Sequence, residues 1–114
     1  MKYKLTKNSK TVNGVVLYQI QALKDFGAVK SGDLGGWIEK EANLSQEGNC
    51  WVFGNAQVYG YSFVSGNAQV YGHAQVTGAA DVFGDAKVCG YAEVYGHARV
   101  YGYARVYGNI NISQ

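Results

Sequence analysis

The apolar positions between residues 52 and 112 recur every six residues. Each hexad begins with Val and has Gly third and Ala fifth, with exceptions only at Ser62, Ile110 and the closing Ile112. Self-similarity at a short fixed period marks a repeat architecture. Residues two apart on a strand share a face, so the fifth residue of one hexad and the first of the next point inward together. Gly then turns the chain, because it tolerates backbone angles that other residues disfavour.

Three such strands and three corners predict a triangular coil of eighteen residues, with successive coils about 4.8 Å apart. Weaker hexads at residues 34–39 and 46–51 keep the same phase. We therefore expect a β-helix that begins near Leu34 and stacks its coils along one axis, as solenoid proteins do.

Upstream of Leu34 the apolar period is two, which is typical of strands. Residues 3–5 are predicted to form a short strand. Asn13-Gly14 lies between two apolar runs and is a strong hairpin signal. Because a solenoid needs its open end covered, this hairpin is the predicted N-terminal cap, followed by a helical turn at residues 22–26. The chain then consists of a cap, residues 1–33, and a β-helix, residues 34–114, in one structural domain.

The V-x-G-x-A-x pattern resembles the hexapeptide repeats of left-handed parallel β-helices, although that family often has Gly directly after the aliphatic residue. The resemblance implies an all-β fold: a single-stranded left-handed parallel β-helix with a hairpin cap. The handedness rests on this resemblance, since crossover connections are usually right-handed. Hexapeptide β-helices are commonly trimers, so the resemblance also implies a homotrimer.

The segment with Gly35-Gly36-Trp37, Asn43-Leu44-Ser45-Gln46, Gly48 and Cys50-Trp51 resembles a group of small, largely uncharacterised β-helix proteins of bacteria and phages. This likeness implies a phage or prophage setting in a bacterial host cell. Some members of that group carry a provisional acyltransferase label.

The composition excludes several classes of protein. The chain has no Pro and a net charge of only +2, which favours continuous strand pairing and argues against long nucleic acid as a partner. A signal peptide and a membrane-spanning run are not apparent, so a cytoplasmic protein is expected. Cys50 is predicted to point inward and Cys89 outward, which argues against a disulfide. Neither a metal site nor a cofactor is predicted.

Stacking by eighteen residues places side chains in columns. One face carries Trp51, Gln69, Lys87 and Arg105 beside Phe53, Tyr71, Cys89 and Tyr107. Exposed aromatic patches mark contacts, so Trp51, Phe53, Tyr71, Cys89 and Tyr107 are the predicted oligomer interface; the alternative is an aromatic ladder that stabilises neighbouring coils. The C-terminal residues lack a visible cap, so end-to-end association is a second expected contact.

Basic groups and flat rings share these faces. The candidate ligand-binding residues are Tyr71, Lys87, Arg99, Tyr101, Arg105 and Tyr107. Rings stack and guanidinium groups bind phosphate, which favours a nucleotide-like anion in a groove between subunits. The alternative is ordinary surface charge, partnered by Asp81, Asp85 and Glu93.

A catalytic site is not predicted. His73 and His97 fall on different corners, and two separate histidines with an outward Cys89 are unsuited to a metal. The main hypothesis is a non-enzymatic oligomeric binding protein that sequesters a nucleotide-like host signal. The alternatives are a self-assembling structural module and a relative of hexapeptide acyltransferases, in which either histidine would be the base.

Overall fold

A computed structural model describes residues 1–113. The chain is all-β apart from one turn of 3-10 helix, η1 (Glu41–Asn43). The elements outside the repeat are β1 (Tyr3–Val12), β2 (Val15–Ala22) and β3 (Leu34–Ile38). The repeat contributes two-residue strands: β4 (Trp51–Val52), β5 (Gln57–Val58), β6 (Phe63–Val64), β7 (Gln69–Val70), β8 (Gln75–Val76), β9 (Asp81–Val82), β10 (Lys87–Val88), β11 (Glu93–Val94), β12 (Arg99–Val100), β13 (Arg105–Val106) and β14 (Asn111–Ile112).

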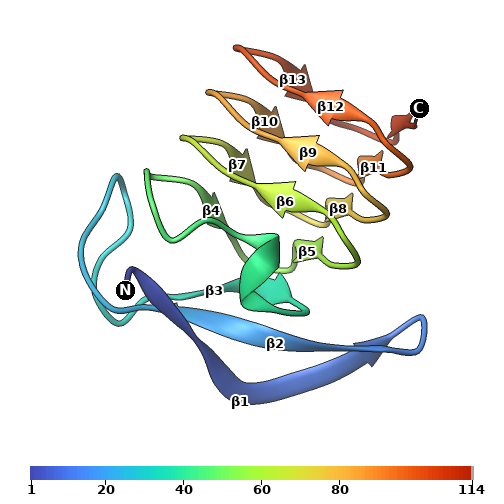
Figure 1. Cartoon of the computed structure of the whole chain (residues 1–114). Coiled ribbons are helices and arrows are strands. Elements are labelled where there is room, and N and C mark those ends of the chain that lie inside the picture. Colours follow the sequence, from blue (N-terminus) through green and yellow to red (C-terminus); the bar gives the residue numbers. More distant parts are fainter. Residues whose placement is uncertain (114) are drawn as a thin grey trace.

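Three parallel ladders form the walls of the solenoid. Their strand orders are β3-β5-β8-β11-β14, β4-β7-β10-β13 and β6-β9-β12, and β1 and β2 extend the first. Strand partners in the repeat lie eighteen residues apart, as in Gln69 with Lys87 and Lys87 with Arg105. In Figure 1 the chain crosses the front through β6, β9 and β12, returns behind, and rises by one coil each time in the left-handed sense. The predicted left-handed β-helix is therefore confirmed.

The interior is a narrow column of Val and Ala. The valines that begin the hexads are buried, among them Val76 and Val94 at 0% exposure, and so are the alanines from Ala56 to Ala98. At the corners the third-position glycines have positive φ. At Gly78 (φ +68°), the Cβ atom of any other residue would also lie 2.7 Å from the backbone nitrogen of Gly96, one coil above. The corner therefore excludes a side chain both by backbone angle and by space.

The first coil is longer than the others. Trp37 pairs with Gln57, twenty residues later, and Leu44 bridges to Val64, again twenty residues later. Trp51, however, pairs with Gln69 at the regular spacing of eighteen. The two additional residues therefore lie between Leu44 and Trp51, in the turn that carries Cys50.

The N-terminal hairpin closes the lower end, and two predictions about it need correction. The first strand runs from Tyr3 to Val12 rather than over residues 3–5, with a bulge between Leu5 and Ser9. The predicted helical turn at residues 22–26 is wrong: these residues leave β2 and enter a tight turn closed by backbone hydrogen bonds between Phe26 and Val29. That turn carries Phe26 against Trp51, and this burial outweighs a weak local helix preference.

Side chains of the cap bond to backbone groups that the first coil leaves open. Inside the repeat, carbonyl oxygens accept from the coil below; Gly66 O and Ala68 O accept the amides of Cys50 and Trp51. Their counterparts eighteen residues earlier, Gly48 O and Cys50 O, have no coil beneath them. They accept instead from the ammonium of Lys2, at 3.2 and 2.8 Å.

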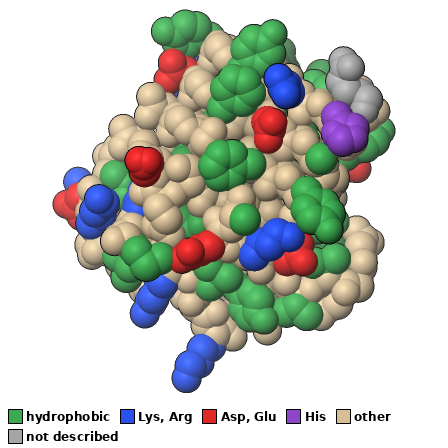
Figure 2. Space-filling view, in the orientation of Figure 1, with side chains coloured by type: hydrophobic (Ala, Val, Ile, Leu, Met, Phe, Trp, Pro, Cys, Tyr) green, Lys and Arg blue, Asp and Glu red, His purple; other side chains and the backbone are tan. Residues whose placement is uncertain are grey.

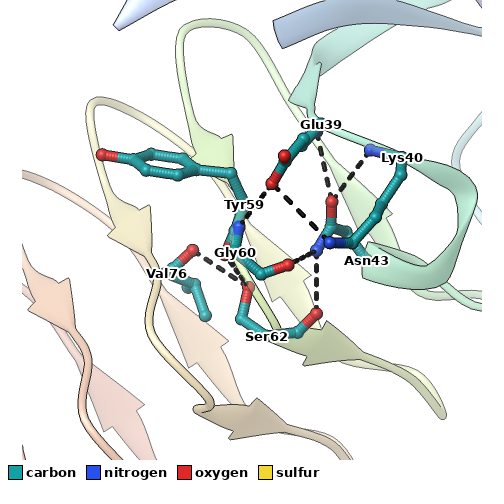
Figure 3. Close-up of polar contacts among 7 residues, drawn as sticks. All are labelled: Glu39, Lys40, Asn43, Tyr59, Gly60, Ser62 and Val76. Atoms are coloured by element: carbon teal, nitrogen blue, oxygen red, sulfur yellow. Dashed lines mark hydrogen bonds and ion pairs between the residues drawn. The ribbon is translucent and has the colours of Figure 1, made fainter. Parts of the chain in front are cut away.

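A second polar cluster holds the first coil to the next (Figure 3). The Nδ2 of Asn43 donates to Gly60 O at 3.1 Å and to Ser62 O at 3.0 Å. The carboxylate of Glu39 accepts from the Gly60 amide at 2.9 Å. Ser62, which replaces Ala in the repeat, is buried and donates through its hydroxyl to Tyr59 O at 2.7 Å. These bonds fix the corner where the longer first coil meets the regular ones.

Candidate functional site

The outer surface of the β4-β7-β10-β13 ladder, here called the basic aromatic face, carries the columns predicted from sequence. Register places Trp51, Gln69, Lys87 and Arg105 side by side in successive coils. Their neighbours two residues on are Phe53, Tyr71, Cys89 and Tyr107. The face is therefore apolar near the cap and cationic at its far end.

Trp51 does not belong to the accessible part of this face. It is 1% exposed and meets the rings of Phe26 and Tyr3 edge-on, with centroids 5.2 and 6.0 Å away. Gly35 makes room for it, because a Cβ there would lie 2.7 Å from the indole. The predicted interface role of Trp51 therefore needs correction: the residue anchors the cap, while Gly36 lets the chain pack closely against Val52 and Ala56.

A hollow of about 410 Å³ lies on the basic aromatic face. Its lining residues are Tyr71, Lys87, Cys89, Arg105 and Tyr107. A shallower hollow of about 330 Å³, lined by Phe53, Gln69 and Tyr71, adjoins it. Tyr71 belongs to both, so the two form one groove that runs parallel to the solenoid axis. The structure thus brings together four of the six residues predicted to bind a ligand.

The groove carries positive charge without a counter-charge. Lys87 and Arg105 are direct partners in neighbouring strands, and within residues 1–113 neither has an ion-pair partner. No acidic side chain lines the hollow. The adjacent Cys89 and burial raise the pKa of the Tyr71 hydroxyl above its ordinary value, so it is protonated at neutral pH. An anion between the two cations would relieve their repulsion.

Arg99 and Tyr101, the other two predicted ligand residues, lie on the next face. They line a separate hollow of about 410 Å³ with His97 and Ile112. Arg99 lies 3.9 Å from the carboxylate of Asp81, so the alternative of ordinary surface charge holds for this residue. Figure 2 shows this side of the molecule, where hydrophobic and charged side chains alternate over the wall formed by β6, β9 and β12. The six residues therefore form two groups within one chain.

The two histidines have different surroundings. His73 stacks on Tyr91, with centroids 5.0 Å apart and ring planes 5° from parallel. His97 lines the hollow with Arg99. Position in the repeat predicted that they are separate, but not which of them adjoins a hollow.

The two cysteines are both free thiols. Cys50 is buried beside the Lys2 ammonium, with Nζ 3.4 Å from Sγ, and burial raises the pKa of its thiol. Cys89 is half-buried on the basic aromatic face. Among the described residues there is no cluster of side chains suited to a metal, and no helix long and apolar enough to cross a membrane.

Comparison with known proteins gives one informative similarity. The sequence matches no protein-family model. A stretch of 51 residues, 44% of the chain, is 49% identical to the uncharacterized acetyltransferase YdcK of Escherichia coli (strain K12). The chain spans only 16% of the length of that protein.

This similarity corrects one prediction. The absence of a catalytic constellation led us to expect a protein that is not an enzyme, and the relationship to an acetyltransferase overturns that expectation.

Proposed function

We propose that this β-helix takes part in acyl transfer. The observation that carries the proposal is the 49% identity over 51 residues to a protein named as an acetyltransferase. The proposal replaces the binding role expected from sequence, because no observation favours sequestration of a host signal over group transfer. The activity, the acceptor and the assembly all belong to the proposal, since the chain corresponds to a small part of that protein.

The residue best placed for the chemistry is His97. Acyl transfer to a hydroxyl or an amine needs a base that removes the proton of the acceptor as it attacks the acyl carbon. The imidazole of His97 adjoins a hollow. Arg99 lines the same hollow, and its side chain, although 3.9 Å from Asp81, is exposed enough to turn toward an anionic donor. His73 has its ring face covered by Tyr91. We therefore assign the base to His97 and a packing role to His73.

The experiment is an acyl-transfer assay with acetyl-coenzyme A and a panel of amine and hydroxyl acceptors, which measures release of the coenzyme A thiol. We expect turnover by the wild-type chain, loss of kcat in His97→Ala, and retention in the matched variant His73→Ala. Equal activity in both variants would remove His97 from the proposal. Release no faster than in buffer, with no binding of acetyl-coenzyme A by calorimetry, would refute acyl transfer.

The assembly and the setting are part of the same proposal. A trimer whose subunits meet along the basic aromatic face, with its groove left open between them, is supported by the half-buried or exposed positions of Phe53, Tyr71, Cys89 and Tyr107 on one wall. Light scattering at several concentrations tests it: a fixed trimer is expected, whereas a monomer or a growing end-to-end series would exclude it. The phage setting rests on resemblance alone.

A further inference from the structure

Aromatic side chains in equivalent positions of successive coils contact one another along this solenoid. Phe83 stacks on Tyr101 with centroids 5.4 Å apart, and Phe53 meets Tyr71 edge-on at 6.4 Å. A coil rise of about 4.8 Å brings neighbouring rings into contact, so a continuous aromatic column leaves no space between its members.

Cys89 interrupts one such column. On the basic aromatic face the equivalent positions are Phe53, Tyr71, Cys89 and Tyr107, and Cys89 is the one without a ring. Tyr71 and Tyr107 therefore lie two coils apart, about 10 Å from backbone to backbone. A planar ring in contact on both faces needs about 7–8 Å between the flanking rings. Beside the short side chain of Cys89, the hollow of about 410 Å³ that both tyrosines line forms a slot with room for one ring.

The charges beside the slot define what the ring would carry. Lys87 and Arg105 precede Cys89 and Tyr107 by two residues and line the same hollow, which has no acidic lining residue. Their repulsion in adjacent strands is relieved by an anion placed between them. Guanidinium and ammonium groups both suit a phosphate.

We propose that this slot binds a planar ring that carries a phosphate, with the ring between Tyr71 and Tyr107 and the phosphate at Lys87 and Arg105. This is the chemistry of a nucleotide. The site lies on a different wall from His97 and does not rest on acyl transfer. A free nucleotide and the nucleotide end of coenzyme A offer the same groups, and the experiment separates them.

The test is titration of the full chain with adenosine monophosphate, followed by quenching of tyrosine fluorescence and by calorimetry. The critical variant is Cys89→Phe, which completes the aromatic column and fills the slot without changing its charge. The matched control is Ser65→Phe, which adds a ring at the equivalent repeat position below Phe83. Cys89→Ala keeps the slot open. Thermal unfolding shows that each variant is folded.

We expect Cys89→Phe to weaken binding by more than tenfold, whereas Cys89→Ala and Ser65→Phe bind as the wild type does. Arg105→Ala should weaken binding by about tenfold, because it removes a charge-assisted hydrogen bond. Ribose 5-phosphate and adenosine, which lack the ring or the phosphate, should bind more weakly than adenosine monophosphate.

Coenzyme A forms the last arm. Tighter binding of adenosine monophosphate assigns the slot to a free nucleotide, and tighter binding of coenzyme A assigns it to an acyl donor, provided that Cys89→Phe removes either. Affinity that persists in a folded Cys89→Phe variant, or no detectable binding of either compound to the wild type, overturns the inference. Acyl-transfer activity measured separately distinguishes this outcome from failure of the proposed function.

Discussion

Replacement of Lys2 by methionine should destabilise the whole solenoid, although Lys2 lies one residue from the N-terminus. Lys2 is 1% exposed, and its ammonium donates to Cys50 O at 2.8 Å, Gly48 O at 3.2 Å and Glu47 O at 3.4 Å. It also lies 4.7 Å from the centre of the Phe26 ring. Methionine has a similar length and apolar character, so Lys2→Met removes the donors and keeps the volume.

The magnitude follows from the carbonyl oxygens that would be left without a donor. Each buried polar group without a partner costs about 1–3 kcal/mol, and Gly48 O and Cys50 O are the two closest acceptors. Burial of the ammonium is itself unfavourable, and this desolvation lowers the pKa of Lys2. Its removal in Lys2→Met offsets part of the cost. We expect a net loss of about 3 kcal/mol in the free energy of unfolding.

Urea unfolding followed by circular dichroism measures this loss, and Lys4→Met is the matched control, because Lys4 lies two residues further along, in β1, and is exposed. A loss of about 3 kcal/mol corresponds to a Tm lower by about 10–15 °C. If the unfolding free energies of Lys2→Met and Lys4→Met agree within about 0.5 kcal/mol, the hydrogen bonds of the Lys2 ammonium to the first coil do not stabilise the fold, and this explanation of the cap is refuted.

Three further predictions test other parts of the fold. Val76→Ala should lower the free energy of unfolding, measured with denaturant, by about 1–3 kcal/mol, because a fully buried side chain is truncated in a narrow core. A smaller loss would mean that the core collapses around the gap. Gly78→Ala should cost at least as much as a strained positive-φ residue, about 1–3 kcal/mol, because its Cβ would also meet Gly96; a neutral result would show that the corner relaxes. Burial raises the pKa of Tyr3, so the folded state keeps this proton where the unfolded chain loses it, and stability should fall as pH rises above about 10, the ordinary tyrosine value. Tyr3→Phe should reduce that fall in pH-dependent unfolding, and an unchanged slope would exclude Tyr3 as its source.

The hexad pattern predicted the solenoid because it specifies the inward side chains directly. Val and Ala at fixed positions determine the strands, the coil length and the columns, and Lys87 beside Arg105 was predicted in register. The sequence did not predict the burial of Trp51, because its repeat position points outward and it is covered by Phe26 and Tyr3 of the cap. The twenty-residue first coil was missed because the spacing of residues 34–39 predicted that Leu34 occupies the inward position of Val52. The structure pairs Ile38 with Val58 instead and leaves Leu34 exposed, so the phase of this hexad is shifted by two residues.

The candidate sites were harder to predict because they depend on which outward residues share a hollow. Arg99 and Arg105 are six residues apart, but a corner separates their walls, and the structure places them in different hollows. His97 and His73 occupy comparable turns in sequence, yet only the neighbouring ring of Tyr91 distinguishes their environments. Periodicity gives the column of a residue, but not the side chains that cover it.

Residues that break the repeat pattern therefore have different explanations according to whether their side chains point into the core or out of it. Ser62 replaces an inward Ala next to the longer first coil, and its hydroxyl bonds to Tyr59 O and Val76 O. That substitution is explained by the hydrogen bonds at the corner where the longer first coil meets the regular ones. Cys89 replaces a ring on an outward column, among regular coils, where its side chain adjoins the Tyr71 hydroxyl and lines the hollow. This outward substitution leaves space beside Lys87 and Arg105, which have no ion-pair partner among residues 1–113. Packing of the fold does not explain it, and for that reason a ligand should be sought at the slot beside Cys89.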